Sequence, residues 1–319
     1  MSEWSGQVAD AIEVSLLLCY HNAEERLPWT LAHLASLHRD ITWELVAVDN
    51  ASSDRAGRDI IAAFADETGC PVQLMEETRP GKQWAFRKGA LAARGKYLVI
   101  VDDDNGLSPD YLSRMVAVFD AHPEVAMVGG RGVLETDVAV PDWFEAVQFR
   151  WAVGPQGRRT EAGPLLYIWG AGTGLRCSWV QQVLATGYPL LMQGPTEKKR
   201  LDGGEDVEWG FIFQALGKVC WYEPGLVYRH KIPGARLTKA HAEALKSSRQ
   251  PATAHVSAYY RPIVAYANAG RKQRARMMWG MIRKKGEFPL EPRVALQLLV
   301  GSGIYVERRV QKLLELELK

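Results

Sequence analysis

The 319-residue sequence predicts an α/β fold, in which a Rossmann-like, mostly parallel sheet is flanked by helices. In the first half, apolar β-rich segments alternate with helical patterns, which is typical of a parallel sheet covered on both faces. The expected strands are residues 14–20, 43–49, 72–76, 97–101 and 125–130. The expected helices between them are residues 24–37, 54–68, 82–94 and 108–121. Polar clusters end three of these strands, and ligands bind at the carboxyl ends of parallel strands.

The chain divides into three parts by pattern. Residues 12–135 hold the regular alternation, and residues 136–245 are irregular, rich in Pro, Gly and Trp, and expected to complete the second half of a site. Residues 246–319 become basic and predict a helical C-terminal extension.

Composition narrows the function classes. A net charge of +2 gives no reason to expect nucleic acid as a partner. The four cysteines form no CxxC pair, so neither a zinc site nor a disulfide framework is indicated. The N-terminus lacks the apolar core of a signal peptide, and no apolar run is long enough to span a membrane. These features predict a cytoplasmic protein.

The segment YLVIVDDDN (97–105) places three aspartates directly after an apolar strand. Adjacent carboxylates are costly unless a cation or separate donors neutralise them. Side chains alternate along extended backbone, so Asp102 and Asp104 are expected on one side. Mg²⁺ and Mn²⁺ prefer such oxygen ligands, and Mg²⁺ usually keeps phosphates as further ligands. The functional interpretation is a metal site that holds a diphosphate, and the alternative is a solvated acidic turn.

Two further polar clusters follow the first two strands. In CYHNAEE, Tyr20 offers a ring for stacking on a base and Glu24 offers a polar contact, while a helix cap by Asn22 is the alternative. In VDNASSD, the carboxylate of Asp49 could accept hydrogen bonds from a nucleobase. The alternative there is a helix N-cap within residues 52–54.

Three later segments carry charge. In RPGKQWAFRKG, Arg79 and Lys82 suit a phosphate or a ribose, or form a solvated basic turn. In LDGGEDVEWGF, Asp206 or Glu205 could act as general base on an acceptor hydroxyl, or stabilise a helix dipole. In YRHKIPGARLT, His230 could complete a metal site or contact a diphosphate, or be an ordinary packed histidine.

Taken in order, these elements resemble an inverting glycosyltransferase of family 2 with the GT-A fold. The resemblance covers about residues 14–240, and its strength lies in the ordered set of motifs. The matching elements are Tyr20-x-Asn22-x-Glu24, V-D-N-A-S-S-D at 48–54, G-K-x-x-A at 81–85, D-D-D-N at 102–105, G-E-D at 204–206 and H-K-I-P-x-x-R-L-T at 230–238.

The resemblance implies a nucleotide-sugar donor, usually UDP-linked, bound by residues 12–135, with the acceptor and the catalytic base in 136–245. It implies that Asp104 ligates Mn²⁺ or Mg²⁺, with His230 near the metal or the diphosphate. Asp206 falls on the catalytic-base position, and Glu205 stands beside it. The donor-binding positions that it implies are Tyr20, Asn22, Glu24, Asp49 (the base), Asn50, Lys82, Asp102 (the ribose side), Asp103 and Arg236.

The acceptor is expected to be a glycan or a lipid-linked molecule. Aromatic rings suit sugars and glycines allow close approach, so IWGAGTGLRCSW (168–179) is expected to shape the acceptor pocket, although its Trp residues could equally belong to the core. The acceptor-binding candidates are Trp169, Gly170, Ala171 and Gly172.

Three other functions fit parts of the pattern. A phosphatase of the haloacid dehalogenase type also has an aspartate motif after an apolar strand, but it expects that motif on the first strand. A sugar-nucleotide pyrophosphorylase, which is a nucleotidyltransferase, expects a Gly-rich, Arg-containing loop after strand one, and CYHNAEERL lacks it. A sugar-nucleotide-binding protein without catalysis is the third alternative, and the intact G-E-D argues against it.

Residues 271–319 combine clusters of Lys and Arg with Met, Trp and Ile. This composition fits a helix that lies on an anionic membrane surface, which would place the protein at the inner face of the membrane as a peripheral protein. The alternatives are a basic helical pair packed on the catalytic domain, or a contact in a homodimer.

Overall fold

The computed structural model describes residues 11–187, 190–192, 203–270 and 273. Its strands are β1 (Val14–Tyr20), β2 (Trp43–Asn50), β3 (Val72–Glu77), β4 (Tyr97–Val101), β5 (Asn105–Leu107), β6 (Val125–Glu135), β7 (Gly163–Leu165), β8 (Gly174–Arg176) and β9 (Val219–Lys231). Its α-helices are α1 (Leu27–Ala35), α2 (Ala56–Thr68), α3 (Lys82–Ala92), α4 (Tyr111–Ala121), α5 (Cys177–Ala185), α6 (Glu205–Ala215) and α7 (Lys239–Asn268). Short 3₁₀ helices are η1 (Glu145–Trp151), η2 (Gln156–Arg158) and η3 (Gly234–Arg236).

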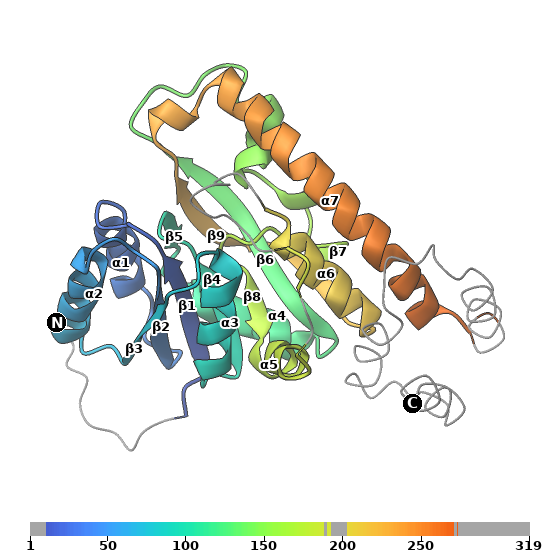
Figure 1. Ribbon diagram of the computed structural model, residues 1–319, viewed down its shortest axis with the longest axis horizontal. Helices are drawn as coiled ribbons and strands as arrows, with labels where there is room; N and C mark the ends of the chain where they lie inside the picture. The colour runs from blue at the N-terminus through green and yellow to red at the C-terminus, as the bar shows by residue number, and fades with distance from the viewer. Residues whose placement is uncertain (1–10, 188–189, 193–202, 271–272, 274–319) are drawn as a thin grey trace.

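The described residues form one nine-stranded mixed sheet, flanked by helices as the sequence predicts (Figure 1). The strand order is β3-β2-β1-β4-β8-β6-β9-β5, and β7 pairs with β9. The first four strands in this order run parallel, because β1 pairs in parallel with both β2 and β4, and β2 with β3. Their carboxyl ends therefore meet at one edge of the sheet, where the polar clusters were expected.

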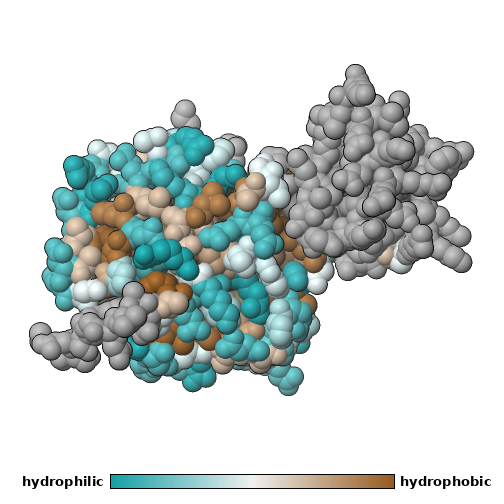
Figure 2. Space-filling view, turned by 90° about the horizontal axis from the view of Figure 1, so that it is seen from below, coloured by the Kyte–Doolittle hydropathy of each residue, from teal (hydrophilic) through white to brown (hydrophobic). Residues whose placement is uncertain are grey.

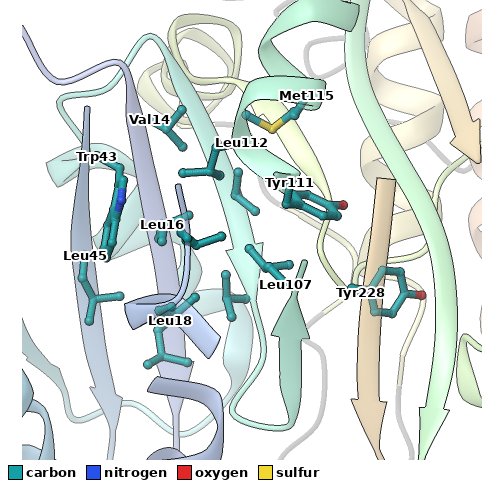
Figure 3. Packing of buried hydrophobic residues seen from close by; sticks show 14 of the residues in the cluster. Val14, Leu16, Leu18, Trp43, Leu45, Leu107, Tyr111, Leu112, Met115 and Tyr228 are labelled. Carbon is teal, nitrogen blue, oxygen red and sulfur yellow. The ribbon is translucent and has the colours of Figure 1, made fainter. Parts of the chain in front are cut away.

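The central strand β1 is buried on both faces, which explains its continuous apolar sequence. Leu16 and Leu18 lie in one core cluster with Tyr111 of α4 (Figure 3). Leu17 points to the opposite face and lies in a second cluster with Phe86 of α3. Strand side chains alternate between faces, so one short strand anchors helices on both sides of the sheet.

The second half of the sheet departs from the expected parallel order. The short strand β8 runs antiparallel between β4 and β6, so β4 and β6 are not neighbours. The three-residue β5 pairs antiparallel with β9, which places Asn105 opposite His230. This pairing brings the aspartate segment and the HKIP segment together, although they are far apart in the sequence.

The long helix α7 lies alongside α6, as Figure 1 shows. The ring of Tyr260 in α7 stacks on Phe211 of α6 at a centroid distance of 6.1 Å. The boundary expected between residues 245 and 246 falls inside α7, and that part of the expected extension is helical. Apart from residue 273, the segment 271–319 lies outside the described residues, so its membrane or dimer contact stays a prediction.

The face seen in Figure 2 carries small hydrophobic patches among hydrophilic residues. Within the residues that the structure describes, no helix is both long enough and apolar enough to cross a membrane.

Candidate active site

A cleft of about 1060 Å³ lies at the carboxyl ends of β1 and β4. One wall carries the three aspartates and Lys82, and the facing wall carries residues of α7 such as Arg249. The start of α6, including Asp206, lines the same cleft. The structure therefore gathers the metal, phosphate and base candidates of the sequence in one hollow.

Asp104 and His230 face each other inside the cleft. The distance between Asp104 Oδ2 and His230 Nε2 is 3.5 Å, and both side chains are only 13–14% exposed. Arg236 approaches the same carboxylate oxygen at 3.6 Å. Burial alone would raise the pKa of Asp104, but the charges of His230, Arg236 and Lys82 outweigh burial and lower this pKa to about 2. Asp104 is thus an ionised carboxylate at neutral pH.

The Asp104–His230 pair fits a divalent metal. His230 Nδ1 lies 2.6 Å from the carbonyl oxygen of Trp151, and a ring that donates there presents the lone pair of Nε2 to Asp104. This second hydrogen bond is the arrangement that orients metal-binding histidines. Within the described ranges, no group of three or more His, Cys, Asp or Glu side chains is gathered as a metal site. Mg²⁺ often takes few protein ligands and completes its shell with phosphates, so these two side chains suffice as a protein contribution.

The other two aspartates are paired with cations of the same wall. Lys82 forms an ion pair with Asp102. Desolvation would lower the pKa of Lys82, but the charges of Asp102 and Glu205 together outweigh it and raise this pKa. Arg26 binds both carboxylate oxygens of Asp103, at 3.1 and 2.8 Å. Asp103 therefore has an internal partner that holds the aspartate turn in place. Arg26 was not among the sequence candidates, although it follows the acidic end of CYHNAEER.

The loop before α3 explains how Lys82 reaches the cleft. Gly81 has a φ of 124°, a conformation that favours glycine, and its N–H donates to Asn50 Oδ1 at 3.0 Å. Asn50 also donates to the carbonyl oxygens of Glu77 and Arg79. The side-chain amide of Asn50 thus holds this loop, and because the residue also lines the cleft, its contact with the donor stays a prediction.

Two of the three candidates in the first loop make contacts within the protein. The ring of Tyr20 is 2% exposed and lies against Gly57 of α2, although the residue is among those that line the cleft, so its stacking on a base stays a prediction. Asn22 accepts hydrogen bonds from the N–H and hydroxyl of Ser53, so it ties two loops together. Glu24 is exposed and is not among the residues that line the cleft.

Asp49 is 8% exposed and accepts a hydrogen bond from the N–H of Ser52 at 3.0 Å. It lies at the carboxyl end of β2, beside the cleft-lining Asn50, but is not itself a lining residue. Asp54 accepts a hydrogen bond from the N–H of Ala56, but the N-cap residue of α2 is Arg55 and no side chain caps this helix, so none of residues 52–54 is its N-cap. The nucleobase contact of Asp49 stays a prediction.

Asp206 and Glu205 open α6 at the floor of the cleft. Gly204 precedes them with a φ of 113°, and this turn aims the first residues of the helix into the hollow. Asp206 accepts hydrogen bonds from the N–H of Gly170 at 3.1 Å and of Val207 at 2.8 Å. Burial raises the pKa of Asp206, against the charge of Arg249 and these two N–H groups. A raised pKa makes a carboxylate a stronger base near neutral pH.

Glu205 is the other candidate base. Its Oε2 is buried without a hydrogen-bond partner among the described residues, and burial raises its pKa against the charge of Lys82. Asp206 differs because two backbone N–H groups fix its carboxylate.

The segment expected to form the acceptor pocket is divided. Trp169, Gly170 and Ala171 line the cleft, and Gly170 also orients Asp206. Gly172 has a φ of 65° and packs against Tyr111 and Tyr228, so it belongs to a core turn rather than to the pocket surface.

The cleft has lining residues that sequence reasoning missed. Phe149 of η1 lies in the cleft with 48% of its surface exposed. Lys246, Arg249 and Arg261 of α7 line the opposite wall. Their spacing places them on one side of a helix, which was a readable signal once a helix is assumed to face the cleft.

Comparison with known families identifies the class of protein. Residues 15–184 match the model of glycosyl transferase family 2, and the chain belongs to this family. Membership of a glycosyltransferase family argues against the phosphatase and nucleotidyltransferase alternatives.

Individual relatives match only in part. The chain is 31% identical over 153 residues to a dolichyl-phosphate beta-glucosyltransferase of Drosophila melanogaster, covering 43% of this chain and 46% of that protein. It is 27% identical over 146 residues to a glucosyl-dolichyl phosphate glucuronosyltransferase of Haloferax volcanii, covering 45% of each chain. The aligned part therefore spans less than half of either relative.

Solved structures with the GT-A fold resemble the whole described body. S. aureus TarS 1-349 in complex with UDP-GlcNAc superposes with a TM-score of 0.51 at 14% identity, covering 91% of this chain and 79% of that one. GalNAc-T7 with UDP, GalNAc and Mn²⁺ gives a TM-score of 0.53 at 12% identity, covering 86% and 55%. At such low identity the likeness concerns the fold, and it confirms the GT-A architecture.

Proposed function

We propose that the protein is a metal-dependent inverting glycosyltransferase that moves a sugar from a UDP-linked donor to a hydroxyl of a glycan or lipid-linked acceptor. The observation that carries this proposal is the single cleft that holds both the Asp104–His230 pair and Asp206. Two solved neighbours support the donor class, because their structures contain UDP-GlcNAc, or UDP with Mn²⁺. The names of two relatives, which include dolichyl phosphate, support a lipid-linked acceptor.

The donor diphosphate is assigned to the wall formed by β4 and β9. Asp104 and His230 would hold Mn²⁺ or Mg²⁺, which supplies positive charge to the oxygens of the leaving diphosphate. Lys82 and Arg236 add fixed positive charge on the same wall. Asp102 is proposed for the ribose side, where its ion pair with Lys82 holds it in position. Asp49 is proposed for the base.

Asp206 is proposed as the general base. It removes the proton from the acceptor hydroxyl while the acceptor oxygen forms a bond to the anomeric carbon. The bond between that carbon and the diphosphate oxygen breaks, and the nucleoside diphosphate leaves with the electron pair. Attack from the face opposite the leaving group inverts the anomeric centre in one displacement, and Gly170 keeps the carboxylate oriented.

The test is a donor screen with the full chain. UDP-sugars and GDP-sugars are incubated with Mn²⁺, Mg²⁺ or EDTA, and released nucleoside diphosphate is measured. We expect release from a UDP-sugar with added metal, and loss of release in EDTA. Asp104→Ala should abolish turnover and sharply weaken metal-dependent UDP binding in calorimetry, because it removes the ionised ligand.

Glu124→Ala serves as the matched control. This carboxylate is 52% exposed and pairs only loosely with His122, at 3.6 Å. The control should keep full activity. Full wild-type activity in EDTA would contradict the metal site, and a preference for GDP-sugars would contradict the proposed base of the donor.

A further inference from the structure

Three cations on one face of α7 have no role in the donor chemistry described above. Lys246, Arg249 and Arg261 are exposed, and all three line the cleft. Thr253 and Ser257 line it between them, alongside apolar residues of the same helix. We name this set of five residues the α7 face.

The pairing of charges differs between the two walls. On the donor wall, Lys82 and Arg26 each bind an aspartate of the DDDN segment. On the α7 face, Arg249 donates to the carbonyl oxygen of Arg150, and no salt bridge joins it or Arg261 to another described residue. Within the described residues, neither guanidinium group therefore has an ion-pair partner, and both line the cleft.

Lys246 has only a weak partner. It lies 3.7 Å from Glu243, whose side chain is 63% exposed and already pairs with Arg150 at 3.0 Å. Exposed ion pairs of this kind contribute little and are readily exchanged for another anion.

The α7 face is longer than a diphosphate. A helix rises about 1.5 Å per residue, so Arg249 and Arg261 stand about 18 Å apart along α7. Arg249 lies at the catalytic end, because its charge acts on Asp206 and its side chain approaches Gly203. Arg261 follows Tyr260, which is held over α6 by Glu208. The donor diphosphate at Asp104 cannot contact both ends.

We propose that the α7 face binds an extended anionic acceptor, whose phosphate or carboxylate groups are spaced so that they reach both Arg249 and Arg261. This inference rests on the proposed transferase function and adds the charge and length of the acceptor to it. Arginine forms two parallel hydrogen bonds to either kind of anion. The exposed ring of Phe149 and the nearby Trp169 offer apolar surfaces for the sugar parts of such a chain. The family match ends at residue 184, so the α7 face lies outside the part of the chain that matches the family model.

The test measures binding of four probes to the full chain by calorimetry: pyrophosphate, long-chain polyphosphate, an oligogalacturonate and a neutral malto-oligosaccharide. We expect both long anions to bind, and the neutral oligosaccharide to bind more weakly than either. Arg261→Gln should raise the Kd of both long anions about fivefold, which corresponds to about 1 kcal/mol of binding free energy, and leave the Kd of pyrophosphate unchanged. Tighter binding of polyphosphate than of oligogalacturonate would assign phosphate as the natural anion, and the reverse would assign carboxylate.

The matched control is Lys239→Gln, which removes an exposed cation of α7 that does not line the cleft. It should leave every affinity unchanged. Equal losses in Arg261→Gln and Lys239→Gln would show nonspecific attraction and overturn the proposal, as would tight binding of the neutral probe alone. UDP affinity is measured in parallel. If Arg261→Gln weakens the binding of UDP as much as that of polyphosphate, the cations belong to the donor site and the proposal is overturned. If the wild-type protein does not bind UDP at all, the proposed function is contradicted instead.

Discussion

The two walls of the cleft handle charge in opposite ways. The donor wall is crowded with ionised groups, yet Arg26 neutralises Asp103 and Lys82 neutralises Asp102. The α7 wall carries fewer charges, but Arg249 and Arg261 have no salt-bridge partner within the described part of the chain. A wall that is neutralised internally can be rigid before any ligand arrives, whereas an uncompensated wall gains most of its partners from the ligand.

The family match falls on one side of this division. Residues 15–184 include Lys82 and the three aspartates of the donor wall, while His230 and Arg236 of that wall, together with α6 and α7, lie beyond the match. The shared part holds most of the site that we propose for the donor. The part outside the match holds the carboxylate that we propose as the base and the surface that we assign to the acceptor. We therefore expect substitutions in the donor wall to weaken donor binding, and substitutions beyond the match to impair transfer while donor binding is kept.

The largest expected effect lies where the walls meet, at Asp206. Asp206→Asn keeps the size and polarity of the side chain but removes the base. Transfer should fall by about two to four orders of magnitude, while UDP affinity changes little. Rates from a transfer assay and affinities from calorimetry measure the two effects separately.

Glu205→Gln is the matched comparison for that variant. It alters the neighbouring carboxylate, whose Oε2 lacks a partner among the described residues. We expect it to retain more transfer activity than Asp206→Asn. The reverse order would assign the base to Glu205 and give Asp206 a structural role.

How far the sequence predicted the site depends on the origin of each contact. The strands and the aspartate turn were predictable, because strand periodicity and local composition are sequence features. The antiparallel β5–β9 pairing was not, since a three-residue strand carries too little pattern. That pairing places Asp104 beside His230, which the sequence suggested only through the resemblance to a family.

The sequence also could not show which side-chain atoms are already used in contacts within the protein. Asn50 stands in a loop that suits a ligand, but its amide is used to hold the turn at Gly81. Tyr20 follows a strand that ends at the cleft, yet its ring turns into the core against Gly57. A motif fixes which residues are present near a site, whereas packing decides which of their atoms remain free.

Two buried glutamates allow the stability of the two halves of the molecule to be compared. Glu44 lies at the amino-terminal end of β2, away from the cleft, where it is fully buried and accepts hydrogen bonds from Ser15, Gln73 and Arg94. Burial would raise its pKa, but the bonds from Arg94 and Ser15 outweigh burial and lower it. Glu44→Gln replaces a charged acceptor by an amide while Arg94 remains exposed to solvent, so it should lower the free energy of unfolding by about 2 kcal/mol at neutral pH.

The pH dependence of this loss has a definite sign. A lowered pKa means that the ionised Glu44 stabilises the fold above its ordinary value of 4.5, and that this contribution is lost as pH falls through the folded-state pKa. Urea unfolding of wild type and Glu44→Gln should therefore converge at acid pH. Glu67→Gln on the exposed surface of α2 is the control, with no expected change. A constant difference at every pH would contradict the assignment.

Glu208 is the counterpart under the α7 wall, and the smallest effect is expected there. It is 1% exposed and accepts hydrogen bonds from the N–H groups of Leu191 and Met192 and from the hydroxyl of Tyr260, which joins α6 to α7. Burial raises its pKa in spite of these bonds. The folded protein therefore keeps this proton longer than the unfolded chain does, and wild type loses stability as pH rises from about 4.5 toward the raised pKa.

Glu208→Gln removes that penalty but turns one N–H₂ group toward a backbone donor, which costs about 1 kcal/mol. The variant should be less stable than wild type at about pH 4 and approach it as pH rises, which is the opposite trend to Glu44→Gln. Urea unfolding of both variants across the same pH series makes the comparison direct. Parallel trends would show that the two buried carboxylates are held alike. Opposite trends would show that the first part of the sheet is stabilised by an ionised carboxylate, whereas the contact between α6 and α7 is stabilised by a carboxyl group that favours its proton.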